Sequence, residues 1–252
     1  MRGIFITIEG IDGCGKTTHA ELLARWLSER GEPVLRTREP GGTALGLELR
    51  NLLLKPGRAI EPAAELLMYL ADRAQHVAEV LRPALAAGQV VVCERYADST
   101  FAYQGYGRGL DLATLRRLND VSTGGLLPDL TLLLDLDPAE ARRRIELGAE
   151  SATAGGQQHT RVRRPDRLEL GQPGLRSRAQ EGFVERLQRA REHWNASADF
   201  QPKVAAGFRA LAAQEPERFR VIETSGEMAS VQREIALAVE GLLDKRRSEG
   251  ST

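Results

Sequence analysis

Five short runs of apolar, largely β-branched residues alternate with longer stretches in which apolar residues recur at helical spacing. The runs cover residues 3–8, 33–38, 89–95, 129–136 and 218–223. Continuous apolar runs are typical of strands that a parallel sheet buries on both faces. With helical stretches between them, the pattern predicts an α/β fold: one five-stranded parallel sheet with helices on both faces.

The residue types at the predicted helix ends agree with this pattern. The first helix is expected to end at Gly31, because glycine readily takes the left-handed conformation of a helix terminus. Residues 61–87 are expected to form one long helix that Pro83 can kink near its end. Asp137 precedes a proline at a helix start, so we expect it to cap that helix rather than to act in catalysis.

Two segments depart from the regular alternation. Residues 148–177 begin with a tract rich in Ser, Thr, Gly and Gln, for which a solvated surface loop and a mobile lid remain equally open. Closely spaced arginines follow that tract: Arg161, Arg163, Arg164 and Arg167. They favour a lid that brings positive charge onto phosphates. A second insertion is expected at about 191–204, within a helical stretch over 178–213. The whole chain, 1–252, is expected to form a single domain.

Composition limits the classes of partner. Lys and Arg number 35 and Asp and Glu number 35, so the formal net charge is zero and no overall positive field attracts nucleic acid or an anionic membrane. No apolar stretch approaches the ~20 residues that span a bilayer, and the N-terminus lacks a signal-peptide pattern. Cys14 and Cys93 do not make a disulfide framework and are expected to be buried thiols. We therefore expect a small substrate, no nucleic acid, no membrane and a cytoplasmic location.

Residues 10–17 carry a glycine-rich motif between a predicted strand and a predicted helix. They match G-x-x-x-x-G-K-[ST], in which glycines let backbone N–H groups converge on phosphate oxygens at a helix N-terminus. Lys16 can reach the β- and γ-phosphates, and the Thr17 hydroxyl can ligate Mg²⁺. The motif predicts a nucleoside triphosphate site. Its residues are Gly10, Ile11, Asp12, Gly13, Cys14, Gly15, Lys16 and Thr17.

Charged and polar residues follow the next two predicted strands, at the edge where open α/β sheets bind ligands. Glu39 begins an E-P-G-G-T turn whose backbone can approach a ligand closely. Glu94 and Arg95 end the third strand, and we expect Glu94 to bind Mg²⁺ or its waters and Arg95 to clamp a phosphate. Thr100, Tyr103 and Gln104 come soon afterwards and offer hydrogen-bonding groups for a base or a sugar.

Tyr69 and Arg73 are four residues apart, which places them on one face of the predicted long helix. One interpretation is a nucleotide site, in which the ring stacks on a base and the guanidinium takes a phosphate. The other is a core tyrosine below a surface ion pair of Asp72 and Arg73. The chain has no N-K-x-D motif that reads guanine, no D-x-x-G switch after a strand and no L-S-G-G-Q motif, which disfavours GTPases and transporter ATPases.

Five elements occur in a fixed order: I-E-G-I-D-G-C-G-K-T-T, T-R-E-P-G-G-T, a D-R pair, E-R-Y-A-D-S-T-F-A-Y-Q-G and L-P-D-L-T-L-L-L-D-L. This set resembles the bacterial thymidylate kinases, and the resemblance extends from residue 4 to about residue 240. It implies a P-loop NTPase fold with an arginine-bearing lid. It also implies an enzyme that transfers the γ-phosphoryl group of ATP to dTMP, giving dTDP, with Mg²⁺ and usually as a homodimer.

The resemblance implies a role for each matching residue. Asp12 would meet the 3′-hydroxyl of dTMP, and Tyr69 would stack on thymine where the family usually has phenylalanine. Thr100 and Gln104 would face the thymine edge, and Tyr103 would crowd the 2′ position. The dTMP site so implied consists of Asp12, Glu39, Arg50, Tyr69, Arg73, Arg95, Thr100, Tyr103 and Gln104, with Arg50, Arg73 and Arg95 on the phosphate. The implied metal ligands are Thr17 and Glu94.

The implied catalytic residues are Asp12, Lys16, Arg95 and Arg167. Because Gly13 rather than an arginine follows Asp12, the chain resembles the subtype whose lid supplies the catalytic arginine, and Arg167 in D-R-L-E aligns best with it. Glu94 replaces the more usual aspartate.

Two alternatives remain at this point. A deoxynucleoside kinase or another P-loop nucleoside monophosphate kinase shares many features, but Arg73 and Arg95 favour an acceptor that already carries phosphate. A nucleotide-dependent switch protein without transferase activity is disfavoured by the intact Asp12, Lys16 and Thr17.

Overall fold

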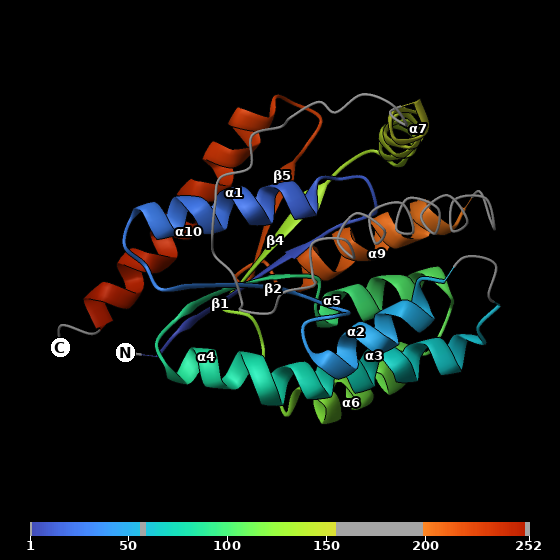
Figure 1. Cartoon of the computed structure of the whole chain (residues 1–252), viewed down its shortest axis with the longest axis horizontal. Helices are drawn as coiled ribbons and strands as arrows, with labels where there is room; N and C mark the ends of the chain where they lie inside the picture. Colours follow the sequence, from blue (N-terminus) through green and yellow to red (C-terminus); the bar gives the residue numbers. More distant parts are fainter. Residues whose placement is uncertain (1, 56–58, 155–198, 250–252) are drawn as a thin grey trace.

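The computed structural model describes residues 2–55, 59–154 and 199–249, and its centre is a five-stranded parallel sheet (Figure 1). The strand order is β2-β3-β1-β4-β5. The strands are β1 (Ile4–Glu9), β2 (Val34–Arg38), β3 (Val90–Glu94), β4 (Leu130–Asp135) and β5 (Phe219–Glu223). All five predicted strands are confirmed, and so is their parallel pairing.

The helices cover both faces of the sheet, as predicted. They are α1 (Lys16–Glu29), α2 (Ala44–Leu53), α3 (Pro62–His76), α4 (Arg82–Ala86), α5 (Ala97–Thr100), α6 (Leu112–Thr123), α7 (Pro138–Ala154), α9 (Phe200–Gln214) and α10 (Met228–Glu249), with two π-helical segments, η1 (Val77–Leu81) and η2 (Phe101–Gly107). Figure 1 shows α1 and α10 on one side of the sheet and α2, α3, α4 and α6 on the other. Alternate residues of β1 enter different cores: Ile4 and Ile6 pack toward α1, while Phe5 packs against Leu81 and Leu85.

The predicted long helix over 61–87 is divided into α3, η1 and α4. The irregular turn lies before Pro83, where the backbone N–H of Arg82 donates to the carbonyl of Val77, five residues earlier. Proline has no N–H, so Pro83 cannot donate to the carbonyl four residues earlier as an α-helix requires. The wider π-helical turn before it changes the pairing of the neighbouring N–H and carbonyl groups. In place of the kink that we expected at Pro83, the structure has a π-helical segment over Val77–Leu81 that ends two residues before this proline.

Other local predictions are confirmed. Gly31 follows α1 with φ 78°, and its N–H donates to the carbonyl of Ser28. Asp137 caps α7, since its Oδ1 accepts the N–H groups of Ala139 at 2.9 Å and Glu140 at 3.3 Å. Cys14 and Cys93 are buried free thiols. Among the described residues, no helix is both long and apolar enough to cross a membrane.

The two predicted insertions are only partly described. Helix α7 continues to Ala154, so the first residues of the segment 148–177 are helical rather than loop. The four closely spaced arginines from Arg161 to Arg167 lie outside the described residues, as does the second insertion up to residue 198. Its last residues belong to α9, in which Phe200 and Val204 are buried.

Helices α9 and η2 approach each other through two glycine–aromatic contacts. A Cβ atom at Gly207 of α9 would lie 2.7 Å from ring carbons of Tyr106, and one at Gly107 of η2 would lie 2.7 Å from Cε2 of Phe200. Each helix thus offers a glycine where the other places an aromatic ring. The resulting close contact fixes η2, which carries Tyr103 and Gln104, against α9.

Candidate active site

A cavity of about 530 Å³ opens at the carboxyl ends of β1, β2 and β3. Most of the residues predicted from the sequence contribute to its wall: Asp12, Gly13, Gly15, Lys16, Thr17, Glu39, Arg50, Tyr69, Arg73, Glu94, Arg95, Thr100, Tyr103 and Gln104. Gly10, Ile11 and Cys14 are buried in the loop beneath this wall. The structure thus gathers residues from three predicted sites, for triphosphate, metal and acceptor, around one space.

The loop between β1 and α1 has the conformation that its glycines predict. Gly10, Gly13 and Gly15 have φ values of 141°, 89° and 96°, which side chains other than glycine rarely adopt. A Cβ atom at Gly10 would lie 2.5 Å from the carbonyl oxygen of Leu134, and one at Gly13 would lie 2.7 Å from that of Ala141. Both the backbone angles and the available space therefore require glycine.

Lys16 is buried and lies against its own loop. Its Nζ donates to the carbonyl oxygens of Gly10 at 3.0 Å and Ile11 at 2.7 Å. These carbonyl contacts hold the ammonium group at the cavity wall. Anionic oxygens entering the loop would compete for the same three N–H donors.

Thr17 and Glu94 form a pair of oxygen donors on neighbouring elements. The Thr17 hydroxyl donates to the Glu94 carboxylate, with Oγ1 at 3.0 Å from Oε1 and 2.9 Å from Oε2. Among the described residues there is no cluster of three or more His, Cys, Asp or Glu side chains able to hold a metal. A hydroxyl and a carboxylate with room for further ligands suit Mg²⁺, which keeps several waters and binds phosphate oxygens.

Arg95 joins the glycine loop to the opposite wall. Its φ of 68° is unusual for a residue with a side chain. Its Nη1 donates to the carbonyl of Gly10 at 3.3 Å, and its Nη2 donates to the Asp12 carboxylate and to the Tyr103 hydroxyl at 3.1 Å. The guanidinium also lies over the Tyr103 ring, 4.9 Å from the centroid.

Glu9, which was not predicted from the sequence, binds the backbone and side chain of residues that follow Arg95. This fully buried carboxylate accepts the backbone N–H of Tyr96 at 2.7 Å and the Ser99 hydroxyl at 2.6 Å. Ser99 in turn accepts from Arg95 Nη1 at 3.1 Å. Burial, and then the charge of Asp98, raise the pKa of Glu9 to about 7. A charged residue at the end of an otherwise apolar strand was the available sequence signal.

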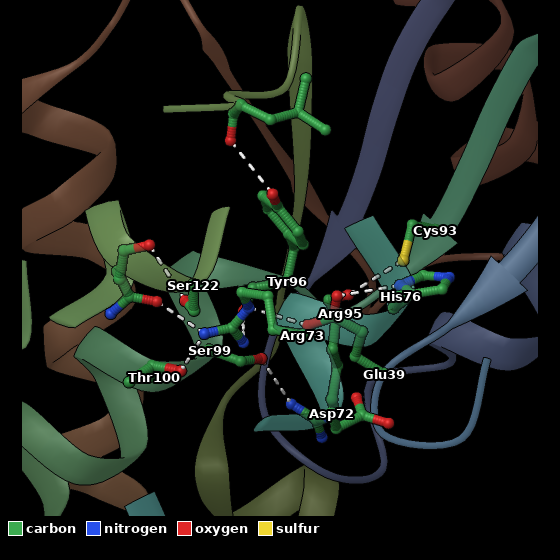
Figure 2. A network of polar contacts seen from close by, with 12 residues as sticks. Glu39, Asp72, Arg73, His76, Cys93, Arg95, Tyr96, Ser99, Thr100 and Ser122 are labelled. Atoms are coloured by element: carbon green, nitrogen blue, oxygen red, sulfur yellow. Dashed lines mark hydrogen bonds and ion pairs between the residues drawn. The ribbon is translucent and has the colours of Figure 1, made fainter. Parts of the chain in front are cut away.

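Arg73 lies at the centre of a buried polar network, with Thr100 on one side and Glu39 on the other (Figure 2). Its Nε donates to Glu39 Oε2 at 2.9 Å, its Nη1 to Thr100 Oγ1 at 2.9 Å and to Asn119 Oδ1 at 2.6 Å, and its Nη2 to the Tyr96 carbonyl at 3.0 Å. Arg73 and Asp72 are buried, 2% and 0% exposed, so the alternative interpretation of a surface ion pair is wrong. Tyr69 lines the cavity instead of the core.

The E-P-G-G turn is anchored by two further side chains. Asp72 Oδ1 accepts the N–H of Gly41 at 2.9 Å, and Arg50 Nη1 donates to the carbonyl of Pro40 at 2.7 Å. Burial, and then the charge of Glu39, raise the pKa of Asp72 to about 6. The braced turn therefore presents Glu39 to the cavity, and Arg50 of α2 lies beside it on the cavity wall.

Glu65, also missed from the sequence, lies behind Gln104. Its Oε1 accepts from Gln104 Nε2 at 3.0 Å, and its Oε2 accepts from Arg108 Nη2 at 3.2 Å. Glu65 and Gln104 are each 3% exposed, and both contribute to the cavity wall. Gln201 of α9 reaches the P-loop side, with Nε2 at 3.4 Å from Asp12 Oδ2.

Comparisons with known proteins agree on one family. The family model described as "Thymidylate kinase" matches residues 8–168. A thymidylate kinase of Gloeobacter violaceus is 44% identical over 247 residues, covering 98% of this chain and 99% of its own length. One of Solidesulfovibrio magneticus is 46% identical over 243 residues, covering 96% and 99%. A crystal structure of thymidylate kinase from Ehrlichia chaffeensis superposes with a TM-score of 0.66 at 30% identity, covering 95% of this chain and 99% of that one.

Proposed function

The chain belongs to the thymidylate kinase family, and on that premise we propose how the residues of its cavity divide the work. It is an enzyme that phosphorylates dTMP to dTDP with ATP. The deoxynucleoside kinase alternative is not favoured. What we propose concerns the role of each residue, the metal, the assembly and the location.

The donor triphosphate binds in the loop from Gly10 to Thr17. The three glycines with positive φ keep backbone N–H groups directed at the loop interior, where they meet phosphate oxygens. Lys16 exchanges its two carbonyl contacts for the β- and γ-phosphates. Thr17 and Glu94 hold Mg²⁺ directly or through its waters, and the ion neutralises phosphate charge when it is bound.

The acceptor dTMP binds on the opposite wall, formed by α3 and η2. Tyr69 stacks on the base, Thr100 and Gln104 face its edge, and Tyr103 packs beside the sugar. Arg73 and Glu39 pair in the fully buried part of the network, whereas Arg95, which pairs with Asp12, is partly exposed at the cavity wall. Arg95 and Arg50 are therefore the better partners for the acceptor phosphate. Arg73 holds Thr100 in place through a hydrogen bond, and the part of its guanidinium that lines the cavity contacts the nucleotide.

The observation that carries this assignment is the position of Arg95. Its guanidinium contacts Gly10 and Asp12 of the donor loop and Tyr103 of the acceptor wall, so it lies where the two substrates meet. The acceptor phosphate is already a competent nucleophile and needs no strong base. Catalysis therefore consists of aligning two polyanions and neutralising their repulsion. Lys16, Arg95 and, from the lid, Arg167 supply the protein's positive charge.

We also propose a cytoplasmic homodimer. Members of the family are usually dimeric, and three helices on one side of this molecule carry exposed apolar side chains: Leu45 and Leu52 on α2, Leu67 on α3 and Val121 on α6. Exposed apolar side chains on neighbouring helices fit a symmetric protein interface. Sedimentation equilibrium tests the dimer, and a monomeric protein at micromolar concentration would contradict it.

The assignment of the acceptor is tested with a panel of nucleotides. ADP release is measured with excess ATP and Mg²⁺ in the presence of dTMP, dUMP, dCMP or thymidine. We expect turnover with dTMP and none with thymidine, because a neutral nucleoside lacks the phosphate that Arg95 and Arg50 would bind. Faster turnover with thymidine than with dTMP would refute this use of the cavity.

A further inference from the structure

We propose that Glu65 is a specificity-determining residue: it fixes the amide of Gln104 so that the acceptor base meets a hydrogen-bond acceptor. The proposal rests on the proposed function of the cavity, in which Gln104 faces the edge of the base. It concerns a residue on α3 that positions another residue on η2. Its consequence is selection of pyrimidines with an imide N–H over pyrimidines with an amino group.

The contacts of Glu65 determine which end of the Gln104 amide faces it. Gln104 Nε2 lies 3.0 Å from Glu65 Oε1, and Arg108 Nη2 lies 3.2 Å from Oε2. A carboxylate paired with an arginine can only accept hydrogen bonds, so the amide group that faces it must be the NH₂ donor. Flipping the Gln104 amide would set a carbonyl oxygen against a carboxylate oxygen in a buried site. The ion pair therefore locks the amide in one orientation.

The locked amide leaves its carbonyl oxygen for a ligand. Gln104 contributes to the cavity wall, and Thr100 lies four residues earlier on the same helical face. Within the described part of the chain, no protein group donates to Gln104 Oε1, whereas Nε2 is occupied by Glu65. A base edge that reaches Gln104 therefore meets an acceptor and must bring a donor.

Pyrimidines differ at the atoms that would meet this oxygen. Thymine and uracil carry a hydrogen on N3, which can donate to the carbonyl. Cytosine has a lone pair on N3 and an amino group on C4, so its edge presents the opposite pattern there. Two buried acceptors that face each other leave both unpaired, and sites built around one substrate N–H reject analogues that lack it. Glu65 thus confers on Gln104 a preference that the flexible amide alone would not have.

The variant Glu65→Gln tests this role at nearly constant volume. The introduced amide can still accept from Arg108 through its carbonyl, which turns its NH₂ group toward Gln104 and favours the flipped Gln104 amide. We measure kcat/KM for dTMP, dUMP and dCMP in the full-length enzyme with saturating ATP and Mg²⁺. We expect kcat/KM for dTMP and dUMP to fall together by about 10- to 100-fold and kcat/KM for dCMP to rise. The matched control is Glu61→Gln, an exposed residue at the start of the same helix, with unchanged ratios.

The three acceptors separate specificity from simple damage. If Glu65 only supports the fold, the values for dTMP, dUMP and dCMP fall by the same factor, and the proposal is overturned. An unchanged dTMP-to-dCMP ratio in a folded Glu65→Gln protein has the same meaning. If the wild-type enzyme instead shows no preference for dTMP over dCMP, the placement of the base beside Gln104 fails, and with it the proposed function of this wall.

Discussion

Replacing Glu9 by glutamine removes a buried charge while keeping the size of the side chain. Glu9 is 0% exposed, and its carboxylate accepts both the Tyr96 N–H and the Ser99 hydroxyl. Burial and the neighbouring charge of Asp98 raise its pKa, while Ser99, Arg95 and the Tyr96 N–H act in the opposite direction. Glutamine can accept from Tyr96, but its NH₂ group must then donate to Ser99. The variant therefore changes both the charge and the direction of one hydrogen bond.

The magnitude follows from the pKa of Glu9. The pKa of the Glu9 carboxyl rises from 4.5 to about 7 on folding. One pKa unit is worth about 1.4 kcal/mol, so ionising Glu9 costs about 3 kcal/mol more in the folded state than in the unfolded chain. The folded protein binds this proton more tightly than the unfolded chain does. Its stabilising effect is complete below pH 4.5 and is lost as the pH rises through about 7. Glutamine has no such dependence.

Urea denaturation of the wild type and of Glu9→Gln at pH 5 and pH 8 measures this contribution. Groups that titrate identically in both proteins cancel when the two free energies of unfolding are subtracted. Because these pH values span most of the transition, we expect the difference between wild type and variant to change by about 2 to 3 kcal/mol, with the variant gaining relative stability at pH 8. If the free energies of unfolding of the two proteins change equally between pH 5 and pH 8, the raised pKa of Glu9 is refuted.

The same variant tests whether Glu9 acts through Ser99 on Arg95. When Ser99 accepts a hydrogen bond from glutamine, its hydroxyl hydrogen loses its acceptor, and the lone pair that accepts from Arg95 is no longer held in place. We expect KM for dTMP to rise about 10-fold in Glu9→Gln. The double variant with Ser99→Ala should then be no worse than the more impaired single variant, because both changes break one chain of contacts. Additive losses would show that Glu9 acts by another route.

Three further predictions concern phosphate and metal binding. Lys16→Ala should lower kcat in the ADP-release assay by about 10³-fold in protein whose thermal transition shows that it is folded, since loss of one electrostatic contact to the transition state costs about 10²- to 10³-fold. Glu94→Gln should raise the Mg²⁺ concentration that gives half-maximal rate, and an unchanged Mg²⁺ dependence would exclude Glu94 as a ligand. Arg167→Ala should lower kcat by about 10²-fold with little change in KM for dTMP; an unchanged kcat would transfer this role to another lid arginine.

The sequence predicted the sheet and the phosphate loop well because both are encoded locally. Each strand is a continuous apolar run, and burial on both faces of the sheet requires this composition. Gly10, Gly13 and Gly15 are needed for backbone angles within a single loop. The helical segment η2 was missed because Gly105 and Gly107 lower helix propensity; its stability comes from packing against α9 instead.

The buried acids that hold other site residues in place, Glu9 and Glu65, could not be predicted in the same way. Glu9 meets Tyr96 and Ser99, and Glu65 meets Gln104, across separations of 87, 90 and 39 residues. Nothing in the spacing of these residues shows which buried acid faces which donor, because the fold alone brings them together. Arg73 illustrates the effect: its motif indicated a phosphate clamp, and the structure adds a buried ion pair with Glu39 that the spacing of the two residues did not indicate.

The reciprocal glycine–aromatic contacts between α9 and η2 have a consequence for protein engineering. Gly207 faces Tyr106, and Gly107 faces Phe200. Transplanting η2 alone from a relative with a different acceptor preference would place a different side chain against Gly207. It could also replace Gly107, against which the Phe200 ring packs. The two helices should therefore be exchanged together, although nearly a hundred residues separate them in the chain. A chimaera that exchanges them together is the one whose acceptor wall should remain intact.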